Sequence, residues 1–267
     1  MHFDKLNLQY VEWHTYLTYE TIHKKAFSKL QNNKLTLTTR IGSDSENAEV
    51  FLYQHKDRLN VMKVIPVTAF NKHHIQPEIN ISLQVSASAY FPKIYATGKC
   101  DFTVFKLSSK FTECKEAFWM IMESIQLDVK QFVTKFDFKF QHIVTIIHQV
   151  IEAIYELNSK FGILHNDLHV GNVMMNVEEN NKIKVKLIDF GSACKFNSKF
   201  DAYSDLCTFL KSLQRHLSSQ NNKNSKTISM FLTRLITHIE LSDEAEEEYD
   251  LQTLQNVLVG LKQEIQL

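Results

Sequence analysis

Four polar side chains in two neighbouring stretches, ILHNDLHVGNVMM and VKLIDFG, have the types and spacing needed for phosphate chemistry. They are Asp167, His169, Asn172 and Asp189. Phosphoryl transfer needs a carboxylate that orients the attacking hydroxyl and accepts its proton, and Asp167 can do this. Asn172 offers a neutral oxygen and Asp189 an anionic one, and both are hard ligands of the kind that Mg2+ binds. The pattern predicts magnesium-assisted phosphoryl transfer.

A structural interpretation competes with this one, in which the aspartates only cap turns at the ends of a helix and a strand. The full pattern is HxDxxxxN followed by DFG, formed by His165, Asp167, Asn172, Asp189, Phe190 and Gly191. At about 5% usage per residue type, a chance match is on the order of 10^-8 per placement. Capping explains an aspartate beside a glycine but not the spacing of all six residues, so we favour the functional interpretation.

The composition excludes several other classes of protein. With 267 residues and 44% hydrophobic content, the chain can form one large domain or two lobes. Thirty basic side chains balance thirty acidic ones, so no overall positive field favours a nucleic acid. The sequence contains no run of 18 apolar residues, so we expect no membrane span. The four cysteines form no CxxC pair, and we expect an intracellular, reducing, cytoplasm-like compartment.

Hydrophobic periodicity predicts an α+β protein with two parts, residues 1–125 and 126–267. In the first part it predicts a helix over residues 9–31, a meander of strands from 34 to 65, one helix near 77–88 and two further strands. The second part begins with a long amphipathic helix that ends at Gly162 as a C-cap. Two short strands and three helical stretches follow it.

The loop HNDLHVGN resembles the catalytic loop HRDLKPEN of protein kinases. This resemblance implies a bilobal fold, with a small antiparallel sheet in the N-lobe and a shortened, mainly helical C-lobe. It also implies ATP with Mg2+ or Mn2+ as cofactors, and protein substrates. Lys63 in NVMKVI matches the family's third-strand lysine, which contacts the α and β phosphates, and Glu78 in PEINISL is similar to its ion-pairing glutamate.

The resemblance extends to the nucleotide site. WMIMESI is similar to the family's fifth strand and hinge, which implies Met122 as gatekeeper and the main chain of Glu123 and Ile125 against adenine. Asp128 either accepts a hydrogen bond from a ribose hydroxyl or caps the following helix.

The glycine-rich loop is a poorer match. RIGSDSENAEVF keeps Gly42 and Val50 as phosphate-covering and nucleotide-contacting positions. Asp44 and Ala48 stand near positions where the family has glycines. An aspartate close to a triphosphate repels it unless its side chain turns to solvent or to the metal.

The catalytic loop also departs from the family pattern. Asn166 replaces the arginine of HRD, and His169 replaces the lysine but can still donate a hydrogen bond to the γ-phosphate. Asp205 resembles the aspartate that anchors the catalytic loop, and it follows Asp189 by only sixteen residues without an APE motif between them.

Three functional hypotheses follow. The first is a Ser/Thr protein kinase similar to the divergent kinases of large DNA viruses, which would place it in the host cytoplasm or the virion. Gly171 stands where the tyrosine-kinase loop has arginine, which argues against that class. The second is a small-molecule kinase of the choline or aminoglycoside phosphotransferase type, whose loop HNDxxxxN is also similar. The third is a pseudokinase that acts as a scaffold.

Overall fold

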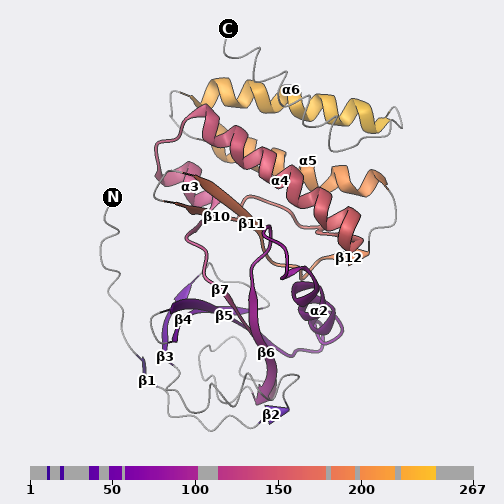
Figure 1. Ribbon diagram of the computed structural model, residues 1–267. Helices are drawn as coiled ribbons and strands as arrows, with labels where there is room; N and C mark the ends of the chain where they lie inside the picture. Colours follow the sequence, from indigo (N-terminus) through magenta and orange to yellow (C-terminus); the bar gives the residue numbers. More distant parts are fainter. Residues whose placement is uncertain are drawn as a thin grey trace. The chain divides into compact units, whose positions relative to one another are not determined.

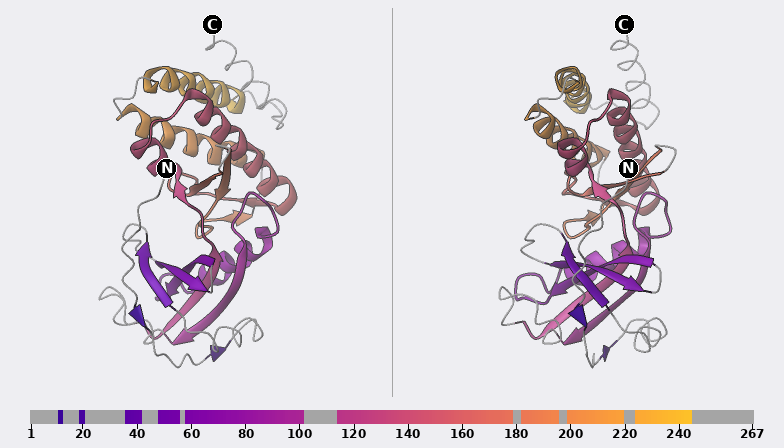
Figure 2. Two further views of the ribbon diagram at one scale, coloured as in Figure 1. Left: turned by 60° about the vertical axis from the view of Figure 1, so that its left-hand side comes forward. Right: turned by 90° about the vertical axis from the view of Figure 1, so that its left-hand side faces the viewer.

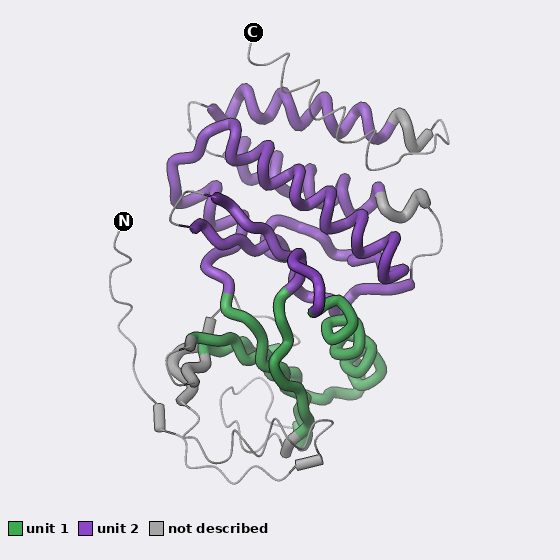
Figure 3. Tube along the Cα trace, viewed as in Figure 1, with its two compact units in different colours: residues 1–86, 92–124 green, residues 87–91, 125–267 purple. Residues whose placement is uncertain are grey.

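The computed structural model describes residues 11–12, 19–20, 36–41, 48–55, 58–101, 114–178, 182–195, 199–219 and 224–244. The fold is α+β, with an antiparallel sheet first and a mainly helical region after it, as predicted (Figure 1). The chain divides into two compact units (Figure 3). Unit 1 contains residues 1–86 and 92–124, and unit 2 contains residues 87–91 and 125–267.

Unit 1 is built on one antiparallel sheet with the strand order β1-β3-β4-β5-β7-β6-β2. Its longer strands contain the β-branched and aromatic residues that fit a pleated surface. They are β3 (Thr36–Ile41), β4 (Glu49–His55), β5 (Arg58–Pro66), β6 (Ile94–Asp101) and β7 (Glu116–Glu123). The strand meander predicted between residues 34 and 65 is therefore confirmed.

Two short strands correct the prediction for the start of the chain. β1 (Val11–Glu12) pairs with β3, and β2 (Tyr19–Glu20) pairs with β6, so the helix predicted over residues 9–31 is wrong at these positions. Val11 and Tyr19 are β-branched and aromatic, and here this preference prevails over the helical spacing of the apolar residues. The rest of the predicted helix lies outside the described residues.

The helix α2 (Ile75–Val85) packs on the sheet of unit 1. Ile75 and Ile79, one turn apart, form a buried cluster with Ala48 and with Ile65 of β5. Glu78 precedes Ile79 in the first turn, where the positive end of the helix dipole favours a carboxylate. Because Ile75 and Ile79 hold this turn, Glu78 is kept close to the sheet.

Unit 2 is organised around α4 (Phe140–Phe161), whose buried face includes Ile143, Ile147, Val150 and Leu157. Gly162 ends α4 in the left-handed conformation, with φ 65°, as the predicted C-cap. The other helices are α3 (Val129–Lys135), α5 (Lys199–Ser218) and α6 (Ser225–Glu244). Figure 2 shows α5 beside α4 and α6, and it packs against both. The third predicted helical stretch lies outside the described residues.

Short strands connect these helices and carry the loops of the site. β8 (Leu127–Asp128), β10 (Val173–Val177) and β11 (Ile183–Leu187) form one small sheet. β9 (Ile163–Leu164) pairs with β12 (Cys194–Lys195) in another. Among the described residues, no helix is long and apolar enough to cross a membrane.

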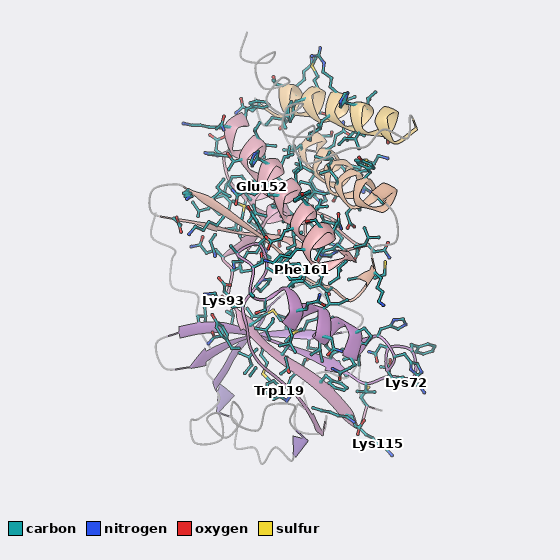
Figure 4. The ribbon with its side chains drawn as sticks, turned by 45° about the vertical axis from the view of Figure 1, so that its right-hand side comes forward. Lys72, Lys93, Lys115, Trp119, Glu152 and Phe161 are labelled. Carbon is teal, nitrogen blue, oxygen red and sulfur yellow. The ribbon has the colours of Figure 1, made fainter. Side chains whose placement is uncertain are left out.

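Residues 87–91 join unit 2 through hydrogen bonds to α4. Ser88 Oγ donates to Glu156 Oε2 at 3.1 Å, and Tyr90 OH donates to Glu152 Oε2 at 2.9 Å. Figure 4 shows Glu152 on α4. Burial, together with the hydrogen bond to Glu152, raises the pKa of Tyr90 to about 12. The phenol therefore stays a donor to the carboxylate throughout the neutral range.

The end of the same segment packs into unit 2. Phe91 is buried and makes edge contacts with Phe161 of α4 and with Phe190, at ring-centroid distances of 6.0 and 5.8 Å. Its carbonyl accepts a hydrogen bond from Lys186 Nζ of β11 at 3.0 Å. The segment thus links α4, β11 and the Phe190 side chain of the DFG sequence.

Replacing Tyr90 by phenylalanine is expected to lower the free energy of unfolding by about 1 kcal/mol, because one hydrogen bond to a carboxylate is lost. The pKa of Tyr90 is higher in the folded than in the unfolded chain, so its contribution is complete below about pH 10 and is lost as the pH rises towards 12. Urea unfolding of both proteins between about pH 7 and 11 measures this difference. Tyr155→Phe, on the exposed side of α4, is the control, and an equal loss in both variants would contradict the assignment.

Candidate active site

In unit 1, Lys63 and Glu78 form an ion pair. Lys63 Nζ lies 2.6 Å from Glu78 Oε1, and the two side chains are only 12% and 9% exposed. Lys63 is opposite Val50 on β4 and Met120 on β7, so the three side chains share one face of the sheet. The predicted phosphate-binding lysine and its predicted partner are therefore brought together.

The strand around Lys63 explains how the sequence holds an ammonium there. Met62 and Val64 point to the opposite face, and both are almost fully buried. Burial of these two side chains fixes the register of β5, so Lys63 must lie on the other face of the sheet, with Val50 and Met120. A charge so little exposed is stable only with a partner, and Glu78 supplies it.

The end of β7 contains the residues predicted to contact adenine. Met122 is half-buried and pairs with Val61 and Ile94. Glu123 donates its N–H to Lys93 O at 2.9 Å, and its Oε2 accepts from Lys93 N at 3.1 Å. The Glu123 side chain thus has a local structural function. Ile125, half-buried, is the first residue of the second segment of unit 2.

In unit 2, Asp205 of α5 holds the start of the catalytic loop. Its Oδ2 accepts from His165 N and its Oδ1 from Asn166 N, both at 2.8 Å. Asp205 is 2% exposed, and this burial raises its pKa, opposed by His165 and the two N–H groups. Asn166 has φ 60°, and its Nδ2 donates to Ser192 O at 3.3 Å. The carboxylate therefore fixes a turn that few side chains tolerate.

The predicted base and metal ligand are joined within the same loop. Asn172 Nδ2 donates to the main-chain oxygen of Asp167 at 2.9 Å, and Ile188 N donates to Asn172 O at 3.0 Å. Only the amide nitrogen can pair with a carbonyl, so Oδ1 is the atom of this amide that can bind a metal. The Asp167 residue is exposed, which suits contact with a substrate.

Asp189 is exposed and lies in the left-handed region, with φ 68°. The turn sends the next side chain, Phe190, inward, where it is 3% exposed and 5.3 Å from the His165 ring. His165 Nε2 also pairs with Ile188 O at 2.9 Å. These contacts hold Ile188 and Phe190, the residues on either side of Asp189, and so fix the main chain from which its carboxylate extends.

Asp128 has a structural function in this unit. Its Oδ1 accepts from Gln131 N at 2.6 Å, which makes it the N-cap of α3. Burial raises the pKa of Asp128, opposed by the Gln131 N–H. The capping alternative is thus observed, and the contact with ribose stays a prediction. Gly42 and Asp44 lie outside the described residues.

The donor set fits Mg2+. Asn172 and Asp189 offer one amide and one carboxylate oxygen, and Mg2+ in phosphate-transferring proteins takes few protein ligands and completes its shell with water and phosphate oxygens. No group of three or more His, Cys, Asp or Glu side chains able to hold a metal occurs in the part of the chain that the structure describes.

Comparison with protein families gives the class. The family described as protein kinase domain matches residues 35–213, more than half of the chain, so the chain belongs to this family. The matched residues run from β3 to α5 and include every predicted site residue. Family membership implies a kinase that uses ATP. No curated protein matches the chain.

Sequence reasoning missed one residue that supports the loop, Ser212, and one contact within the loop, between Gly171 and His169. Ser212 Oγ accepts from Val170 N at 3.4 Å, and Gly171 N donates to His169 Nδ1 at 3.0 Å. Ser212 follows Asp205 by seven residues, which is two helical turns, so both lie on the same face of α5. This spacing is the signal that could have identified Ser212.

Proposed function

We propose that the protein is a Ser/Thr protein kinase that transfers the γ-phosphoryl group of ATP to protein hydroxyls. The Lys63–Glu78 ion pair carries this proposal, because a kinase fold that had lost catalysis would have no need to keep a nearly buried lysine in this position. The Asp205-anchored loop with Asp167 and Asn172 supports it from the second unit.

In this proposal each polar residue has a separate task. Lys63 binds the α and β phosphates, and Glu78 holds its ammonium in place. Asp167 orients the acceptor hydroxyl and takes its proton, while His169 donates a hydrogen bond to the γ-phosphate. Asn172 and Asp189 hold Mg2+, which when bound offsets the charge on the transferred group.

The remaining predicted residues bind the nucleoside. The main chain of Glu123 and Ile125 would bind adenine beside Met122, and Val50 would cover its face. Val50 shares the Lys63 face of the sheet, which supports this assignment. Gly42 would contribute to the phosphate cover, and Asp128 would contact the ribose only in addition to capping α3.

The acceptor class is inferred from the loop sequence. Gly171 occupies the position of the tyrosine-kinase arginine, which favours Ser and Thr as acceptors. The absence of an APE motif between Asp189 and Asp205 is the observation in favour of a small-molecule acceptor such as choline or an aminoglycoside. The likeness to kinases of large DNA viruses rests on the same short segment between Asp189 and Asp205, and it stays a hypothesis.

Nucleotide binding gives the first test. ATP with Mg2+ or Mn2+ at 100 times its dissociation constant stabilises the folded chain by about 2.7 kcal/mol, which a thermal shift detects easily. Asp189→Ala is expected to abolish the metal-dependent part of this shift, whereas Asp137→Ala, an exposed carboxylate between α3 and α4, should keep it. The absence of a shift with every nucleotide tested would refute the kinase proposal.

The acceptor is identified by a second assay. Purified protein is incubated with labelled ATP and either a protein mixture or a panel of choline, aminoglycosides and sugars, with Asp167→Asn as the inactive control. Label on phosphoserine or phosphothreonine supports the proposal. Label only on a small molecule would assign the protein to the alternative class, and nucleotide binding without any transfer would identify a pseudokinase.

A further inference from the structure

Gly171 and the His169 ring contact each other in the loop that contains Asp167. The Gly171 N–H donates to His169 Nδ1 at 3.0 Å. A Cβ atom at position 171 would lie 2.9 Å from Cε1 of the imidazole and 3.0 Å from its Nδ1. Gly171 does not have the left-handed backbone that would itself call for glycine, since among the described glycines only Gly162 has a positive φ. A side chain at position 171 would therefore require the His169 ring to move.

This hydrogen bond also determines where the ring carries its proton. A main-chain N–H is only a donor, so in this contact His169 Nδ1 is the acceptor and does not carry the proton. In the neutral ring the proton then lies on Nε2, which becomes the single donor of the imidazole. The contact thus fixes a tautomer as well as an orientation.

The main chain of His169 forms hydrogen bonds with Asp167, the predicted base, and with Asn172, the predicted metal ligand. His169 N donates to Asp167 O at 3.1 Å, and Asn172 N donates to His169 O at 2.9 Å. The loop is tied in turn to the rest of unit 2, because Val170 N donates to Ser212 Oγ at 3.4 Å. The imidazole therefore has a fixed position relative to the predicted base and the predicted metal ligand.

We propose that Gly171 is a positioning residue, which holds His169 as the Nε2–H tautomer so that its Nε2–H offers a directed hydrogen bond to a phosphate oxygen. This inference rests on the proposed function. The matching lysine of the kinase loop HRDLKPEN would supply a mobile ammonium group, whereas His169 would supply one donor in a fixed direction. The direction of this donor would then determine how well the phosphoryl group is oriented.

The test uses the full chain labelled with 15N in its histidines. Two-bond 15N–1H correlation spectra distinguish the two tautomers, and the His169 signals are assigned by their loss in His169→Asn. We expect an unprotonated Nδ1 and a protonated Nε2 in the wild type. In Gly171→Ala the added methyl group displaces the ring, and we expect mixed tautomers and a turnover number lowered about 10-fold, with the KM for ATP changed much less.

Gly162→Ala is the matched control, because this substitution also strains a loop glycine but meets no atom within 4 Å. It should lower stability without changing the His169 signals or the turnover number. A wild-type spectrum with the proton on Nδ1, or unchanged signals and turnover in Gly171→Ala, would overturn the inference. The wild-type spectrum remains decisive if Gly171→Ala does not fold. The expected tautomer in a protein that transfers no phosphate would refute the proposed function and leave the tautomer assignment standing.

Discussion

Replacing Asp167 by asparagine is expected to lower the turnover number for phosphoryl transfer by about 100-fold or more, because the proton acceptor is lost. The loop itself should survive the change. The hydrogen bond from Asn172 Nδ2 goes to the main-chain oxygen of Asp167, not to its carboxylate, and Asp205 still anchors His165 and Asn166. Steady-state kinetics against ATP and the identified acceptor measure the effect, and the KM for ATP should change little.

The control separates catalysis from folding. Asp137→Asn removes an exposed carboxylate of the same unit and should leave turnover unchanged. Both variants should show the same Mg2+-dependent thermal shift with ATP as the wild type. Near-normal turnover in Asp167→Asn would show that another carboxylate accepts the proton.

The sequence predicted best those elements whose pattern is long and strongly periodic. α4 repeats buried Ile and Val residues over six turns and ends at a left-handed Gly162, so its period and its end are both encoded locally. The start of the chain is different. Residues 9–31 mix helical spacing with β-branched and aromatic residues, and at Val11–Glu12 and Tyr19–Glu20 pairing with β3 and β6 decides the outcome.

The site was predictable in its residue types but not in its contacts. Spacing alone selected Asp167, Asn172 and Asp189, since the pattern is too specific for chance. Spacing cannot predict that Tyr90 reaches Glu152 across 62 residues, because that contact depends on how α4 packs. The contact of Gly171 with the His169 ring is local, yet it depends on a side-chain rotamer, which sequence periodicity does not encode.

The Lys63–Glu78 ion pair of unit 1 is expected to contribute as much to the turnover number as Asp167 does. Lys63→Met should lower turnover by about 100-fold, because the phosphates lose their fixed cation in a weakly solvated position. Glu78→Gln should reproduce part of this loss, because the Lys63 ammonium loses the carboxylate 2.6 Å away that holds it in place. The double variant should be little worse than Lys63→Met, because the two side chains act as one unit.

Lys99 provides a matched control on the same sheet. It pairs with Glu116 at 2.8 Å, but the two side chains are 34% and 53% exposed, so its ion pair contributes little. Lys99→Met should therefore leave turnover and stability nearly unchanged, whereas Lys63→Met is expected to remove most of the activity. If Lys63→Met retained normal turnover, the phosphate-binding lysine would have to be another one. Lys72 in the exposed turn before α2 is then the alternative, and Lys72→Met would show the loss that Lys63→Met did not.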